Sequence, residues 1–328
     1  MHLDPFDLHR PTSIDETIDL ARSLAGKFDY LAGGTDLLPN YKMHLNLRPN
    51  LIALTEVEEL HGHRLDRIGA MSRLADLEED AEFGRTFPIL AEAIQQVATP
   101  LVRASATVGG NLLVETRCFF FNQSQFWRES LGFCLKADGD RCHVVPQKEK
   151  CYATFSGDLA PALEVLDAEV EIAGPSGRRR TALTEFYDAG GDGIRRHHLA
   201  NGELLVAVHL PESARRRVGN YQKLRVRPSF DFPELSIAIA GRMDQGVVTE
   251  LGLAVGGLET FPKRFDALTQ PYIGRPLSDE HIDALATEVE RKVRPVHNTF
   301  LLPDYRKQMS RVYVRRGLRR FREEASRS

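Results

Sequence analysis

Along the first 215 residues, segments with apolar residues at helical spacing are interleaved with short apolar runs that are typical of strands. Ser13-Ile14-Asp15-Glu16 is a capping-box pattern, and apolar residues then recur at helical spacing, which predicts a helix from residue 14. Short apolar runs predict strands at 28–32, 50–55, 67–71, 168–173 and 204–210. Further helices are expected at 88–99 and 159–166. Up to residue 215 the pattern therefore mixes short strands and helices, with no clean βαβ repeat.

The pattern changes after residue 215. Apolar runs at 221–226, 236–243 and 247–255 predict strands, and Asp244-Gln245-Gly246 predicts a hairpin turn between the last two. Helical patterns follow at 278–293 and 304–321. An antiparallel sheet with helices on one side is typical of a separate α+β domain, so we assign the chain to the α+β class.

Composition and charge exclude several classes of protein. The chain has 328 residues, of which 42% are hydrophobic and 27% charged, which is typical of a globular protein with two or three domains. No apolar run approaches the ~20 residues that span a bilayer, and residues 1–5 carry no signal-peptide pattern. The net charge of −3 argues against nucleic acid as a partner. We expect a cytoplasmic protein without a membrane segment.

All four cysteines of the chain, Cys118, Cys134, Cys142 and Cys151, fall in one window. The spacing contains no C-x2-C pair, so it matches neither a zinc ribbon nor a ferredoxin. Disulfides are not expected, because cytosolic thiols stay reduced. The spacing leaves three interpretations open, which are an iron–sulfur cluster on four thiolates, a zinc ion, and buried thiols without a ligand.

Two glycine pairs, Gly33-Gly34 and Gly109-Gly110, each follow an apolar stretch. Paired glycines let successive backbone N–H groups approach an anion such as a pyrophosphate, although a single pair is usually only a tight turn. Neither pair fits the dinucleotide or P-loop patterns. The histidine pairs His61-x-His63 and His197-His198 lie in polar stretches, and we interpret them as surface residues.

Four motifs occur together in an order that resembles the FAD-binding subunit of the xanthine oxidase family of molybdenum enzymes. They are Leu31-Ala32-Gly33-Gly34-Thr35-Asp36, Thr107-Val108-Gly109-Gly110-Asn111, Gly157-Asp158-Leu159-Ala160-Pro161 and Tyr221-x-Lys223. The resemblance covers nearly the whole chain. It implies a two-part FAD-binding domain (VAO/PCMH-like), with subdomains at 1–57 and 58–215, followed by a smaller α+β domain at 216–328.

The same resemblance implies the FAD contacts. One loop, with Leu31, Ala32, Gly33, Gly34, Thr35 and Asp36, would wrap the pyrophosphate, and a second, with Thr107, Gly109, Gly110 and Asn111, would form another cradle. Asp158 would bond the flavin or its ribityl chain, Leu205 would pack on the isoalloxazine, and Lys223 would lie near the flavin edge. By themselves, Asp158 is a plausible helix N-cap and Lys223 a solvated strand lysine. No residue is expected to act as a catalytic acid or base.

The cysteine window, at 115–152, is missing from ordinary members of that family and resembles the inserted loop of 4-hydroxybenzoyl-CoA reductase β subunits. That loop holds a [4Fe–4S] cluster, which implies that Cys118, Cys134, Cys142 and Cys151 are its ligands here. The resemblance implies electron flow from ferredoxin through the cluster and FAD. The acceptors would be a [2Fe–2S] subunit and a molybdopterin-binding subunit, in an (αβγ)2 assembly that removes the hydroxyl of 4-hydroxybenzoyl-CoA.

Three alternatives stay open at this point. The first is the FAD subunit of an oxidative molybdenum hydroxylase that donates electrons to NAD or quinone. The second is an interaction subunit in which zinc staples the cysteine loop to a partner. The third is a free-standing flavin oxidoreductase with its own substrate pocket.

Overall fold

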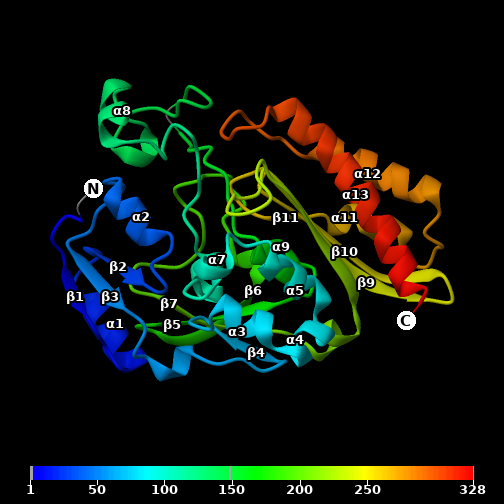
Figure 1. Ribbon diagram of the computed structural model, residues 1–328, viewed down its shortest axis with the longest axis horizontal. Coiled ribbons are helices and arrows are strands. Elements are labelled where there is room, and N and C mark those ends of the chain that lie inside the picture. Colours follow the sequence, from blue (N-terminus) through cyan, green and yellow to red (C-terminus); the bar gives the residue numbers. More distant parts are fainter. Residues whose placement is uncertain (1–2, 148, 328) are drawn as a thin grey trace.

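The structure is a computed structural model that describes residues 3–147 and 149–327. Three sheets organise this part of the chain, and they follow one another from the N-terminus to the C-terminus (Figure 1). Across these residues, every helix is too short or too polar to cross a membrane.

The N-terminal sheet is parallel, with the strand order β1-β3-β2. Its elements are β1 (Asp7–His9), α1 (Ile14–Ser23), β2 (Phe28–Leu31), α2 (Leu37–Lys42) and β3 (Asn50–Ala53). The hydroxyl of Ser13 accepts the backbone N–H of Glu16 at 3.2 Å, so the predicted cap is confirmed. The parallel β2-α2-β3 unit was not predicted, because strands of four residues are too short to display a period.

The second sheet is antiparallel, with the order β4-β7-β5-β6. Its strands are β4 (Arg67–Gly69), β5 (Glu169–Gly174), β6 (Gly177–Ala182) and β7 (Leu204–His209). A bulge interrupts the alternation of side chains along β7, so the neighbours Val206 and Ala207 both pack with the N-terminal region, whereas Leu205 and Val208 pack against helices. Those helices are α3 (Leu74–Glu79), α4 (Ala81–Thr86), α5 (Pro88–Gln95), α6 (Pro100–Arg103), α7 (Val108–Leu112), α9 (Leu159–Glu164) and α10 (Leu183–Phe186).

The third sheet is antiparallel and both of its faces are covered. Its elements are β8 (Val218–Leu224), β9 (Leu235–Asp244), β10 (Val247–Gly256), β11 (Lys263–Arg264), α11 (Asp266–Thr269), α12 (Asp279–Lys292) and α13 (Pro303–Ala325). Ile237 and Ile239 of β9 pack with α12 and α13, whereas Ala238 and Ala240 join the core of the preceding region. The predicted boundary near residue 216 therefore separates two sheets that share a continuous apolar interface.

The cysteine segment leaves α7 and rises away from all three sheets (Figure 1). Among its described residues, regular helices are α8 (Gln125–Ser130) and a short 3-10 helix, η2 (Leu135–Ala137). The guanidinium of Arg128 donates to the carbonyls of Met43 and His44 at 3.0 and 2.9 Å, which ties α8 to the loop after α2. The segment is thus anchored on the N-terminal region.

Candidate functional site

The two glycine loops lie directly against each other. A Cβ at Gly33 would stand 1.8 Å from the carbonyl oxygen of Ser105, so the backbones meet where only glycine fits. The hydroxyl of Thr107 caps α7 by accepting the N–H of Gly110 at 3.0 Å. The N–H of Gly109 donates to the carbonyl of Ala70 at 2.8 Å. The fold therefore brings together two motifs that lie about 70 residues apart in the sequence.

A cleft of about 620 Å³ opens beside these loops. Ala32, Gly33 and Thr107 line it, together with His63, Ser72 and Arg73 from the segment after β3. This volume lies within the roughly 300–1,000 Å³ of typical ligand pockets. The cleft joins glycine backbone to polar side chains, which is the chemistry that a phosphate-bearing cofactor requires.

The other residues of the two predicted loops surround this contact. Thr35 is exposed at the turn after β2, and Leu31 accepts the N–H of Leu54 at 2.9 Å through its carbonyl. The amide oxygen of Asn111 accepts the N–H of Leu159 at 2.9 Å, which joins the second motif to the third. Asp36 forms an ion pair with Arg117. The structure thus places both loops and the start of α9 in one neighbourhood.

The carboxylate of Asp158 bonds to residues of the third sheet and does not cap its own helix, α9. Its carboxylate accepts the hydroxyl of Tyr221 at 2.6 Å and the ammonium of Lys223 at 3.0 Å, and it makes no cap hydrogen bond. Burial raises the pKa of Asp158 and lowers that of Lys223. Lys223 is therefore a buried lysine, in contrast to the solvated strand lysine that its sequence context allows. Whether either residue contacts a flavin stays a prediction.

Leu205 lies in the centre of β7, opposite Ile172 of β5. Its side chain is 2% exposed and belongs to the main core, outside the lining of the cleft. Its proposed packing on an isoalloxazine ring stays a prediction.

All four cysteines line one small buried cavity, although they come from separate turns of the chain. Cys118, Cys134, Cys142 and Cys151 form its wall together with apolar side chains such as Phe120 and Val144. Two sulfurs accept backbone N–H groups at 3.4 Å, from Phe120 to Cys118 and from Ala153 to Cys151. The window that the sequence singled out therefore folds into a single site.

Burial dominates the acid–base properties of these thiols. It raises the pKa of Cys118 to about 12 and that of Cys151 to about 11. A metal or cluster would have to displace these protons on binding, because the thiolate is the ligand form. Within residues 3–147 and 149–327, no three His, Cys, Asp or Glu side chains converge as closely as a single metal ion requires.

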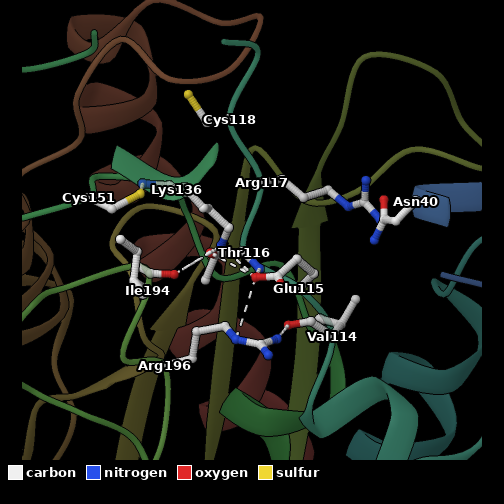
Figure 2. Close-up of polar contacts among 12 residues, drawn as sticks. Asn40, Val114, Glu115, Thr116, Arg117, Cys118, Lys136, Cys151, Ile194 and Arg196 are labelled. Atoms are coloured by element: carbon white, nitrogen blue, oxygen red, sulfur yellow. Dashed lines mark hydrogen bonds and ion pairs between the residues drawn. The ribbon is translucent and has the colours of Figure 1, made fainter. Parts of the chain in front are cut away.

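A buried ionic group lies behind the cysteine cavity. Figure 2 shows Lys136, Glu115 and Thr116 turned toward one another, with Arg196 on the other side of Glu115. Lys136 Nζ lies 2.5 Å from Glu115 Oε1, and Arg196 Nε lies 3.5 Å from the same oxygen. Although burial acts in the opposite direction, the charges of Lys136 and Arg196 lower the pKa of Glu115 to about 2. Sequence reasoning missed this group, because its members are far apart along the chain.

Arg117 connects the glycine loop to the cysteine segment. It precedes Cys118, pairs with Asp36, and lies over the ring of Phe232 with 4.0 Å between guanidinium carbon and ring centroid. Figure 2 shows its side chain extending toward Asn40 of α2. The side chain of Arg117 thus contacts both the predicted FAD loop and the loop between β8 and β9. In the sequence it lies next to Cys118.

The interpretation of the histidine pairs as surface residues needs correction for two of the four. His63 is half-buried, hydrogen-bonds to the carboxylate of Asp80 at 2.9 Å, and lines the cleft. His197 stacks on Phe186 with 5.5 Å between centroids, and burial lowers its pKa to about 4. Their partners lie on other elements, so the local polarity of the sequence gave no signal.

Comparison with known proteins matches both halves of the chain. The family of the FAD binding domain in molybdopterin dehydrogenase matches residues 4–213, and that of the CO dehydrogenase flavoprotein C-terminal domain matches 220–321. The aldehyde oxidoreductase FAD-binding subunit PaoB of Escherichia coli is 34% identical over 73% of this chain and 77% of its own length. The carbon monoxide dehydrogenase medium chain of Afipia carboxidovorans is 25% identical over 98% of both chains.

Solved structures share the fold. Reconstituted CO dehydrogenase from Oligotropha carboxidovorans superposes with a TM-score of 0.81 at 23% identity, over 98% of this chain and 99% of the other. Quinoline 2-oxidoreductase from Pseudomonas putida 86 gives 0.77 at 19% identity, over 99% of each chain. The three sheets are thus a recurring arrangement.

Proposed function

This chain belongs to the FAD-binding medium subunits of the xanthine oxidase and CO dehydrogenase family of molybdenum enzymes, and we propose that it carries a [4Fe–4S] cluster beside the FAD. Its role would be electron transfer within a larger oxidoreductase. The observation that carries the cluster proposal is the single buried cavity lined by all four cysteines.

The cleft beside the glycine loops is the proposed FAD site. FAD, when bound, supplies an electron carrier that takes up one or two electrons. The backbones at Ala32, Gly33 and Gly34 and the capped turn at Thr107 are proposed to hold the pyrophosphate, because they line or adjoin the cleft. Asp36 and Asn111 would act by fixing the two loops, through Arg117 and Leu159.

The cysteine cavity favours a cluster over a zinc ion. A zinc site draws its thiolates to about 2.3 Å from one ion, and no such convergence exists in the described residues. A [4Fe–4S] cluster is held by four cysteine thiolates, which agrees with four cysteines around a common cavity. The apolar wall excludes water, and the N–H groups of Phe120 and Ala153 would stabilise bound thiolate sulfur.

The comparisons favour an oxidative reaction for the complex. The relative at 34% identity is named an aldehyde oxidoreductase subunit, and others are named xanthine and carbon monoxide dehydrogenase subunits. We therefore propose an aldehyde-oxidising molybdenum enzyme, with molybdopterin-binding and [2Fe–2S] partner subunits. Electrons would leave through this chain to an acceptor such as NAD or quinone.

The second candidate is the reductive reaction. The cysteine segment resembles that of 4-hydroxybenzoyl-CoA reductases, which supports electron entry from ferredoxin and an (αβγ)2 assembly. The two candidates differ in direction and substrate but share the same two cofactors on this chain. An assay of the purified complex with aldehydes and acceptors, against 4-hydroxybenzoyl-CoA with reduced ferredoxin, separates them.

Cofactor content tests the core of the proposal. We expect about four iron, four acid-labile sulfide and one FAD per copy of this chain in the anaerobically purified complex. Cys118→Ser should lose iron and keep FAD, whereas Thr107→Ala, which removes the cap of α7, should weaken FAD retention and keep iron. One zinc per chain, or an iron-free wild-type protein with normal FAD, would contradict the cluster.

A further inference from the structure

Lys136 is a fully buried lysine in the wall of the cysteine cavity. It follows Cys134 by two residues in η2, and its side chain is 3% exposed. Its ammonium has three acceptors, which are Glu115 Oε1 at 2.5 Å, the carbonyl of Gly193 at 3.0 Å and the hydroxyl of Thr116. A lysine is costly to bury, so three acceptors converging on it indicate a built site for a positive charge.

Charged side chains of both signs surround Lys136. Glu115 carries one negative charge and is shared between Lys136 and Arg196. Arg196 is further held by the carbonyls of Leu113 and Val114, at 2.9 and 3.1 Å. Lys136 is the ammonium that reaches the cavity wall itself, among sulfur and mostly apolar carbon, where charges interact more strongly than in water. On the other side, the carboxylate of Asp192 accepts the N–H of Cys151 at 3.0 Å.

We infer that Lys136, held in place by Glu115, raises the reduction potential of the proposed [4Fe–4S] cluster. This inference rests on the proposed function. Four thiolates give such a cluster a net negative charge, and reduction adds one electron from an external donor without forming or breaking a covalent bond. A buried ammonium nearby stabilises the more negative, reduced form more than the oxidised form. Lys136 is a positioning residue for charge and does no bond chemistry.

The test is a redox titration of the holo-complex, followed by electron paramagnetic resonance. Lys136→Met removes the charge at similar length, and Lys136→Arg retains it. We expect Lys136→Met to lower the equilibrium constant for cluster reduction at least tenfold, which is about 59 mV for one electron, while Lys136→Arg stays close to wild type. Lys150→Met is the matched control, because Lys150 is an exposed lysine next to Cys151.

A second variant decides the case if Lys136→Met fails to retain iron. Glu115→Gln removes the negative charge and should shift the potential upward, and the double variant Lys136→Met/Glu115→Gln should return near the wild-type value because the two charge changes cancel. An unchanged potential in iron-replete Lys136→Met, or a downward shift in Glu115→Gln, overturns the inference. A wild-type protein without iron instead overturns the proposed cluster, and with it this role.

Discussion

The side-chain amide of Asn298 donates to the carbonyl of Tyr152 at 2.6 Å, one residue after Cys151. The backbone carbonyl of Asn298 accepts the N–H of Phe119 at 3.0 Å, one residue after Cys118. Its amide oxygen accepts a hydrogen bond from the fully buried Arg306 of α13 at 3.1 Å. The C-terminal region thus clamps two cysteine-bearing segments through one residue.

Replacing Asn298 by alanine should loosen this clamp. The change leaves the Tyr152 carbonyl and a guanidinium N–H of Arg306 short of a buried partner, which typically costs about 1–3 kcal/mol in the free energy of unfolding. We also expect lower iron retention at equal FAD content. Denaturant unfolding and iron analysis measure the two effects. Asn201→Ala, in the exposed turn before β7, is the control and should change stability by less than about 0.5 kcal/mol.

The contact between the two glycine loops predicts that alanine destabilises the protein at position 33, whereas alanine at position 84, outside these loops, does not. Gly33→Ala forces a methyl group against the Ser105 carbonyl, so we expect destabilisation of about 1–3 kcal/mol and at least tenfold weaker FAD binding. Gly84→Ala in α4 meets only an ordinary contact at 3.9 Å and should stabilise by roughly 0.5–1 kcal/mol. Fluorescence titration with FAD and thermal unfolding measure both. Normal FAD affinity in Gly33→Ala would rule out the glycine loop as the cofactor cradle.

The Asp158–Lys223 pair predicts strong coupling between α9 and β8. Lys223→Met leaves a buried carboxylate with the Tyr221 hydroxyl alone and should cost about 3–5 kcal/mol. Asp158→Asn combined with Lys223→Met should recover part of that loss, and a double-mutant cycle measures the coupling. If the double variant folds well but loses FAD, the pair also serves the cofactor. If it keeps FAD fully, the role of the pair is structural.

Glu164 predicts a pH dependence of stability. Its side chain is 2% exposed in α9, and, among the described residues, its Oε2 has no hydrogen-bond partner. Burial raises its pKa from 4.5 to about 8. The folded state therefore holds a proton that the unfolded state releases, so this stabilising contribution is complete below pH 4.5 and is lost as the pH rises through 8.

The slope from this single group is about 1.4 kcal/mol per pH unit between those limits. Glu164→Gln imitates the protonated form, so its stability should exceed that of wild type at pH 8 and the slope should flatten. Urea unfolding from pH 5 to 8 measures this. Glu169→Gln, an exposed carboxyl of β5, is the control. Equal slopes in Glu164→Gln and wild type would contradict the prediction.

The sequence alone determined the elements whose signals are local. The Ser13 cap, the 244–246 hairpin turn with Gln245 and Gly246 at positive φ, and the last two helices were confirmed. These features depend on caps, turn residues and periodicity, which act over a few positions. The crowding of the cysteines into one window was equally visible, because it is a matter of spacing.

Only the tertiary structure decided which residues meet. Lys136 hydrogen-bonds to Gly193 across 57 positions, and Lys223 pairs with Asp158 across 65. No local pattern in the sequence marks either lysine as buried, and their burial results from packing between distant elements. The same holds for the parallel N-terminal sheet, since strand pairing is set by contacts that no local pattern encodes. Burial in turn shifts the pKa values of the buried carboxylates and thiols and strengthens the interactions between buried charges, on which the proposed electron transfer depends.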